Sequence, residues 1–106
     1  MPRYLIEATY TLEGVRGIVS AGGTTRRDAA AATCESVGGK LVSLDFALGE
    51  RDIFLICELP DNEAAVAVSL AVNASGRTKA RTIPLISPEE VDAAAQRSVP
   101  YRAPGQ

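Results

Sequence analysis

Carboxylate and hydroxyl side chains stand at alternate positions of extended segments, where they could bind a ligand or move a proton. Glu7 lies two positions before Thr9, Asp45 lies two positions after Ser43, and Glu58 closes a third segment. Residues two apart on a strand share one face of its sheet. A carboxylate in a partly apolar enclosure has its charged form disfavoured, which suits it to acid–base catalysis near neutral pH. Asp45 and Glu7 are therefore the candidate catalytic residues.

The candidate ligand-binding residues add apolar side chains of the same segments: Thr9, Ser43, Phe54, Ile56 and Glu58. A few polar groups on apolar walls are the usual composition of a small-molecule pocket. Two plainer interpretations stay open. The hydroxyls can bond each other or water, and the carboxylates can be solvated or form structural ion pairs. The possible cationic partners are Arg3, Arg77 and Arg81.

The residue types argue against catalytic sites based on histidine, a metal ion or a cysteine nucleophile. The chain has no histidine, which removes histidine triads, histidine metal sites and proximal-histidine haem ligation. We expect no cofactor and no metal site. Cys34 shares a helical face with Ala30 and Val37, and Cys57 falls on an inward strand position. Both cysteines are therefore predicted to be reduced, buried and inert, with raised pKa values.

Length and charge narrow the class of protein. The 106 residues are enough for one domain with its own core. A net charge of −2 with scattered basic residues argues against nucleic-acid binding, although Gly14-Val15-Arg16-Gly17 matches the GxxG of a KH loop. The N-terminus lacks a signal-peptide pattern and no apolar run is long enough to span a bilayer. We therefore expect a cytoplasmic protein that contacts neither nucleic acid nor membrane.

Periodicity, caps and breakers predict an order of four strands and four helices. The expected elements are strand 3–10, helix 12–20, helix 24–37, strand 40–48, strand 53–59, helix 62–74, strand 78–86 and helix 88–97. The predicted N-caps are Thr11, Thr24 or Thr25, Asp61, and Ser87 with a capping box. Pro84 requires the fourth strand to lie at an edge or to be bulged.

This order is that of an α+β, ferredoxin-like βαββαβ fold with an extra C-terminal helix. Right-handed crossovers give an antiparallel sheet with strand order 4-1-3-2 and both main helices on one face. Residues 1–97 are the predicted domain, and residues 98–106 are expected to form an extended C-terminal tail.

Strand parity assigns side chains to the two faces of the sheet. An even loop at Gly49-Glu50-Arg51-Asp52 places Phe46 on the face of Ile53, Leu55 and Cys57. That apolar face, expected to lie under the helices, also includes Val42, Leu44, Leu48 and Leu59. The opposite face is expected to carry Leu5, Glu7, Thr9, Leu41, Ser43, Asp45, Ala47, Asp52, Phe54, Ile56 and Glu58. Tyr4 and Tyr10 are expected in the core or at its rim. Because an open face with Phe54 and Ile56 would be an exposed apolar patch, we expect a second subunit to cover it.

Four stretches lie in the order and spacing of a known family: YTLEGV at 10–15, ESVGGKLVSLDFALGERDI at 35–53, PDNEAA at 60–65 and ASGRTKARTIPLISPEE at 74–90. The chain resembles the small bacterial GYD-domain proteins of the dimeric α/β-barrel superfamily. The resemblance implies a ferredoxin-like fold and a dimeric barrel, and it brings no agreed catalytic residues. Arg51 stands where the family has an aromatic residue, which implies a more polar barrel mouth.

These observations predict a homodimer, or a higher homo-oligomer, joined through sheet faces. Its barrel would bind a small apolar or aromatic molecule, or turn one over without a cofactor by carboxylate acid–base catalysis. The alternative is a non-catalytic structural, interaction or stress-associated module in which the barrel interior is only packing.

Overall fold

The computed structural model describes residues 1–106, and its centre is a four-stranded antiparallel sheet. The strands are β1 (Arg3–Tyr10), β2 (Lys40–Phe46), β3 (Ile53–Glu58) and β4 (Thr78–Leu85). Their order across the sheet is β2-β3-β1-β4, which is the predicted order counted from the other edge. The ferredoxin-like α+β fold is therefore confirmed, and Pro84 lies on an edge strand, where its missing N–H is tolerated.

Four helices complete the chain: α1 (Leu12–Ala21), α2 (Gly23–Ser36), α3 (Asn62–Ala74) and α4 (Pro88–Ala95). Three of the predicted caps are confirmed. Thr11 accepts from the Gly14 N–H, Asp61 accepts from the Ala64 N–H, and Ser87 forms a capping box. The predicted threonine cap of the second helix is wrong. That helix begins at Gly23, and Gly22 takes a left-handed φ of 89° that joins α1 to α2.

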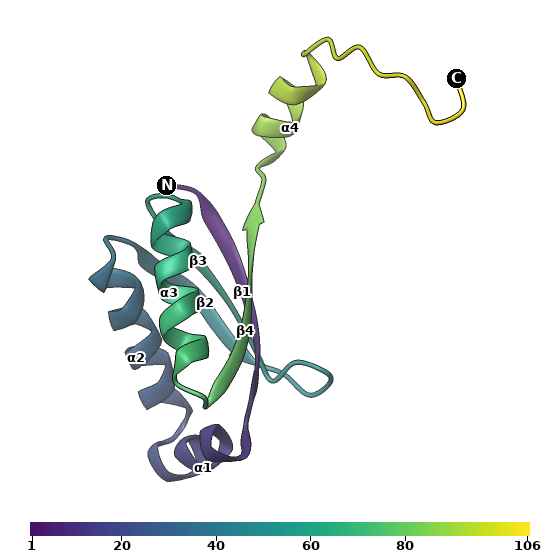
Figure 1. Cartoon of the computed structure of the whole chain (residues 1–106). Helices are drawn as coiled ribbons and strands as arrows, with labels where there is room; N and C mark the ends of the chain where they lie inside the picture. Colours follow the sequence, from purple (N-terminus) through teal and green to yellow (C-terminus); the bar gives the residue numbers. More distant parts are fainter.

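Helices α2 and α3 lie side by side over one face of the sheet, called here the helix face (Figure 1). The largest wholly buried side chains are Tyr4, Cys57 and Leu59, beneath these helices. The Tyr4 hydroxyl donates to Asn62 Oδ1 at 2.7 Å, which ties β1 to the first turn of α3. Apolar side chains at alternate positions of β1 and β3 thus form the core, as period-two patterning predicts.

A β-bulge in β2 changes the predicted assignment of faces. Leu41 pairs with Cys57 and Ser43 pairs with Ile56, so Val42 is an extra residue between two successive pairs. Leu41 consequently lies on the helix face and packs against the core, whereas Val42 is 38% exposed. The predictions that Leu41 lies on the opposite face and that Val42 lies under the helices are therefore wrong. Strict alternation does not detect a bulge.

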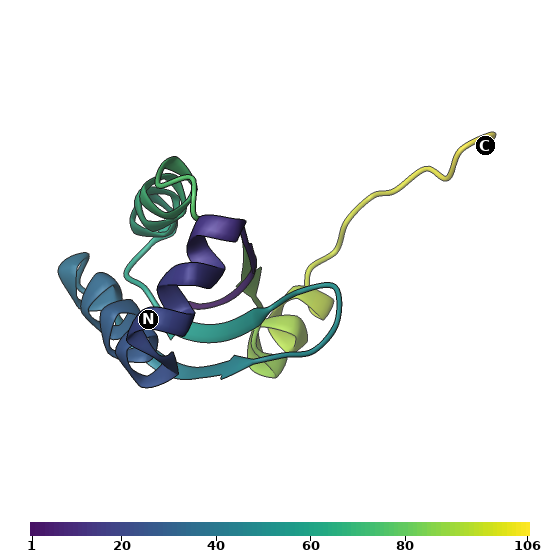
Figure 2. The same cartoon turned by 90° about the horizontal axis from the view of Figure 1, so that it is seen from below.

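The hairpin loop and the C-terminus also differ from the predicted boundaries. Strand β2 ends at Phe46, and Leu48, predicted beneath the helices, is fully exposed in the loop. Helix α4 ends at Ala95, although the Arg97 N–H still donates to the Ala94 carbonyl oxygen at 3.0 Å. Figures 1 and 2 show α4 and the last residues projecting beyond the end of β4, away from the two-layer body. The domain boundary at residue 97 stays a prediction.

None of the helices combines the length and the apolar character that crossing a membrane requires.

Candidate functional site

The face of the sheet opposite α2 and α3 is called here the open face, and α4 does not cover it because α4 lies beyond the end of β4 (Figure 1). Strand registers place directly paired residues on the same face. The open face carries Leu5, Glu7, Thr9, Ser43, Asp45, Phe54, Ile56, Glu58, Lys79, Arg81 and Ile83. Glu7 lies between Phe54 and Arg81, and Asp45 pairs with Phe54 across the hairpin, as strand parity predicted. The structure therefore groups the seven candidate site residues on one surface.

Glu7 is held by a cation from the hairpin loop. Arg51 Nε lies 3.4 Å from Glu7 Oε1, and the Glu7 side chain is only 18% exposed. This partner was missed by sequence reasoning, which considered Arg3, Arg77 and Arg81. The loop conformation decides where Arg51 reaches, and no pattern in the sequence encodes that. Arg51 thus brings a guanidinium to the open face.

Asp52 fixes the base of the same loop to β1. Its carboxylate accepts from the Tyr10 N–H at 2.8 Å, and its own N–H donates to the Ala8 carbonyl oxygen at 2.9 Å. Its carbonyl oxygen accepts from the Ala47 N–H at 2.8 Å. Two of these bonds join the hairpin to the end of β1, and the third closes the loop itself. Asp52 therefore sets the position from which Arg51 reaches Glu7.

The other polar residues of the open face differ in whether they have an ion-pair or hydrogen-bond partner within the chain. Glu58 lies 4.0 Å from Arg3, an ion pair that sequence reasoning considered. Asp45 forms no ion pair, and the Ser43 and Thr9 hydroxyls make no hydrogen bond within the chain. Asp45, Ser43 and Thr9 are thus the groups free to bind another molecule, and their roles stay predictions.

Thr82, a further strand hydroxyl, does not lie on the open face. It pairs with Ile6 and faces α3, where its Oγ1 is buried without a hydrogen-bond partner. Gly14 and Gly17 do not form a KH loop, because both lie within α1 and Gly14 is buried against Arg77.

Both cysteines are free and buried in the core cluster, as predicted. The neighbouring Cys34 thiol and burial together raise the pKa of Cys57, whose S–H donates to the Tyr4 carbonyl oxygen at 3.9 Å. Interaction with the Cys57 thiol lowers the pKa of Cys34, against the effect of burial. The predicted raised pKa is thus wrong for Cys34, because the effect of the Cys57 side chain outweighs that of burial.

Tyr10 lies at the rim of the core, under the helices. Burial raises its pKa above the usual 10.0, the Arg26 guanidinium opposes this shift, and Asp52 adds to it. Its hydroxyl is thus protonated at neutral pH and points away from the open face. No group of three or more cysteine, aspartate or glutamate side chains is arranged to hold a metal ion.

Comparison with models of protein families identifies the family of this chain. The family model of the GYD domain matches residues 4–95, from the second residue of β1 to the last residue of α4. Neither the curated proteins nor the solved structures gave a match. The matched span includes every candidate residue of the open face and the loop that carries Arg51 and Asp52. The chain belongs to the GYD domain family.

Proposed function

We propose that two copies of the chain join through their open faces and enclose a space that binds a small apolar or aromatic molecule. The observation that carries this proposal is the composition of the open face. Leu5, Phe54, Ile56 and Ile83 lie together on a sheet surface that no helix of the chain covers. Water contact with such a patch is unfavourable, and a second copy removes it.

The size of the open face limits how the two copies meet. Four strands at about 4.8 Å spacing and six paired residues at about 3.3 Å each span roughly 380 Å². A stable interface buries about 800 Å² on each partner, so contacts beyond the sheet must contribute. The projecting C-terminal arm, residues 86–101, exposes Ile86, Val91, Val99 and Tyr101. We propose that this arm packs on the second copy and supplies the remaining contact area.

If the enclosed molecule is turned over, Asp45 is the group best suited to move the proton. Glu7 already has Arg51 as its partner, whereas Asp45 has none. Ser43, two residues away on the same strand face, and Thr9 would orient the substrate by hydrogen bonds. Glu7 and Arg51 would then act as a fixed dipole at the wall of the space. Acid–base catalysis of this kind requires no cofactor.

The alternative is a non-catalytic interaction module. The ion pairs Glu7–Arg51 and Glu58–Arg3 favour it, since structural networks commonly hold carboxylates in this way. In this case the open faces would pack directly on each other and leave no space for a ligand.

Native mass spectrometry of protein purified from its own host separates these functions. Binding predicts a dimer that carries a small molecule, and we expect Asp45→Asn with Ser43→Ala to reduce the liganded fraction. Asp28→Asn, at an exposed position of α2, is the matched control. A ligand-free dimer from every preparation would support the interaction module, and a monomer would exclude both.

A further inference from the structure

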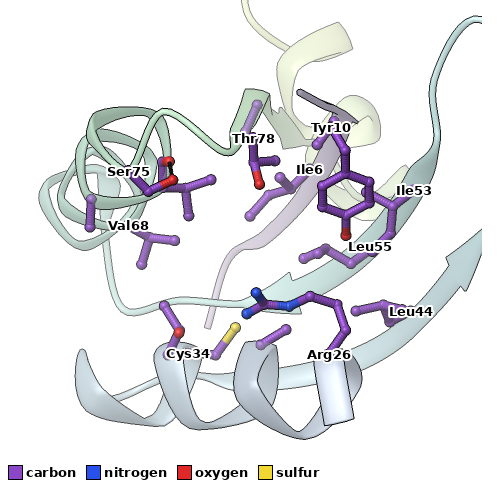
Figure 3. Close-up of a pocket in the computed structure, with 16 residues that line it drawn as sticks. Ile6, Tyr10, Arg26, Cys34, Leu44, Ile53, Leu55, Val68, Ser75 and Thr78 are labelled. Atoms are coloured by element: carbon purple, nitrogen blue, oxygen red, sulfur yellow. Dashed lines mark hydrogen bonds between the residues drawn. The ribbon is translucent and has the colours of Figure 1, made fainter. Parts of the chain in front are cut away.

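A second site lies on the other side of the sheet, between the helices. Helix α2 packs over β2 and α3 packs over β4, so the inner strands β1 and β3 lie beneath a gap. The gap is a cavity of about 260 Å³ lined mainly by apolar side chains of α2, α3 and the sheet (Figure 3). The helices contribute small residues such as Ala30 and Ala71, which leave this volume unfilled.

One cation enters this apolar space. Figure 3 shows the Arg26 side chain extending from α2 into the cavity, below the ring of Tyr10. No carboxylate lies within 4.0 Å of its guanidinium, and its side chain donates no hydrogen bond within the chain. The neighbouring Arg27 points elsewhere and pairs with Asp28. A guanidinium held in partly apolar surroundings without an anion is a strong binding partner for one.

The mouth of the cavity near α1 adds to the positive charge. A polar depression that shares Tyr10, Arg26 and Thr78 with the cavity is also lined by Arg16, Arg77 and Glu13. Glu13 is occupied by Arg77 at 3.8 Å, which leaves Arg16 and Arg26 without a carboxylate. Two free arginines at one opening stand out on a chain whose net charge is −2. This local field attracts anions.

We propose that the cavity between α2 and α3 binds a small amphipathic carboxylic acid. Its apolar body lies among Leu44, Leu55 and Val68, and its carboxylate pairs with Arg26. An apolar protein cavity of about 150 Å³ accommodates benzene. The 260 Å³ found here therefore suits a larger body, of the size of an eight-carbon chain. The site lies on the helix face, so it does not depend on how the open face is covered.

Titration of the full chain with octanoate, followed by calorimetry and by amide chemical shifts, tests the proposal. We expect saturable binding with a Kd below about 1 mM, and shifts on α2, α3 and the inner strands. The uncharged probe octan-1-ol has the same chain length and should bind at the same place more weakly. Arg26→Met keeps the apolar length of the side chain and should weaken octanoate binding about ten- to hundredfold. Octanol binding should be unchanged.

Two matched variants make the outcome decisive. Arg27→Met removes a charge from the adjacent position of α2, whose side chain is 56% exposed, and should leave octanoate binding unchanged. Ala30→Leu fills the cavity and should abolish binding of both probes, whereas Ala32→Leu on the exposed side of α2 should not. The proposal is overturned if octanoate fails to saturate below about 1 mM. It is equally overturned if Arg26→Met and Arg27→Met have the same effect.

Discussion

Replacing Asp52 by alanine removes the anchor between the hairpin loop and β1. The lost bond joins a carboxylate to the Tyr10 N–H at 2.8 Å in a half-buried position, and alanine leaves that N–H without a protein partner. A hydrogen bond to a charged group contributes about 1.5–3 kcal/mol to the free energy of unfolding. For a domain of this size, the loss corresponds to a fall in Tm of roughly 6–15 °C. Asp52→Asn keeps a neutral acceptor, so it should lose about half as much.

Urea denaturation of wild type, Asp52→Ala and Asp52→Asn at one fixed chain concentration measures these differences in unfolding free energy. Asp28→Ala is the control, because the Asp28 side chain is 73% exposed and pairs only with Arg27. Its unfolding free energy should change by less than about 0.5 kcal/mol. Asp52→Asn should also lower the pKa of Tyr10, since the Asp52 charge contributes to raising it. An Asp52→Ala protein as stable as the control, or equal stabilities of the Asn and Ala variants at position 52, would show that the Asp52 carboxylate does not anchor the loop.

Two further outcomes follow from the packing and from the pKa shifts. Gly14→Ala should lower the unfolding free energy by about 1–3 kcal/mol, because its Cβ would overlap the Arg77 carbonyl oxygen. In the same helix, the Cβ of Gly17→Ala meets no atom within 4 Å, so this variant should raise the unfolding free energy by about 0.5–1 kcal/mol. Thermal melts in which Gly14→Ala is more stable than Gly17→Ala would contradict this packing. The neighbouring Cys34 side chain and burial raise the pKa of Cys57 above 9.0, so the unfolded chain releases this proton first and the unfolding free energy should fall as pH rises above 9.0. A urea midpoint that is constant or increases from pH 9 to pH 10 would show that Cys57 is not buried as a neutral thiol.

The strand order and most of the face assignments could be predicted from the sequence, because period-two alternation and helix caps are local signals. The alternation of β1 and β3, and of β2 after its bulge, correctly placed Asp45, Phe54 and Ile56 on the open face. The bulge at Val42 could not be predicted. Val42, Leu44 and Phe46 alternate as in a regular strand, so the sequence gives no sign that Val42 is an extra residue. A single inserted residue therefore reversed the assignment of Leu41.

Contacts that depend on loop conformation and on the distance between helices could not be predicted from the sequence either. The pair Glu7–Arg51 depends on the conformation of a six-residue connection, from 47 to 52, that no periodic pattern describes. The cavity with Arg26 depends on how far α2 and α3 lie apart. Alternation and helical periodicity identify which residues face inward, but they do not measure the space between two helices.

Sedimentation velocity on wild type, Ile56→Glu and Val66→Glu tests the central claim most directly. Ile56 lies on the open face, and Val66, which is 55% exposed, lies on α3 on the other side of the sheet. If the open faces meet, wild type and Val66→Glu sediment at twice the 11.1 kDa chain mass, and Ile56→Glu sediments as a folded single chain. A wild-type protein that sediments as one chain at micromolar concentration, or an Ile56→Glu variant that still dimerises, would contradict the account.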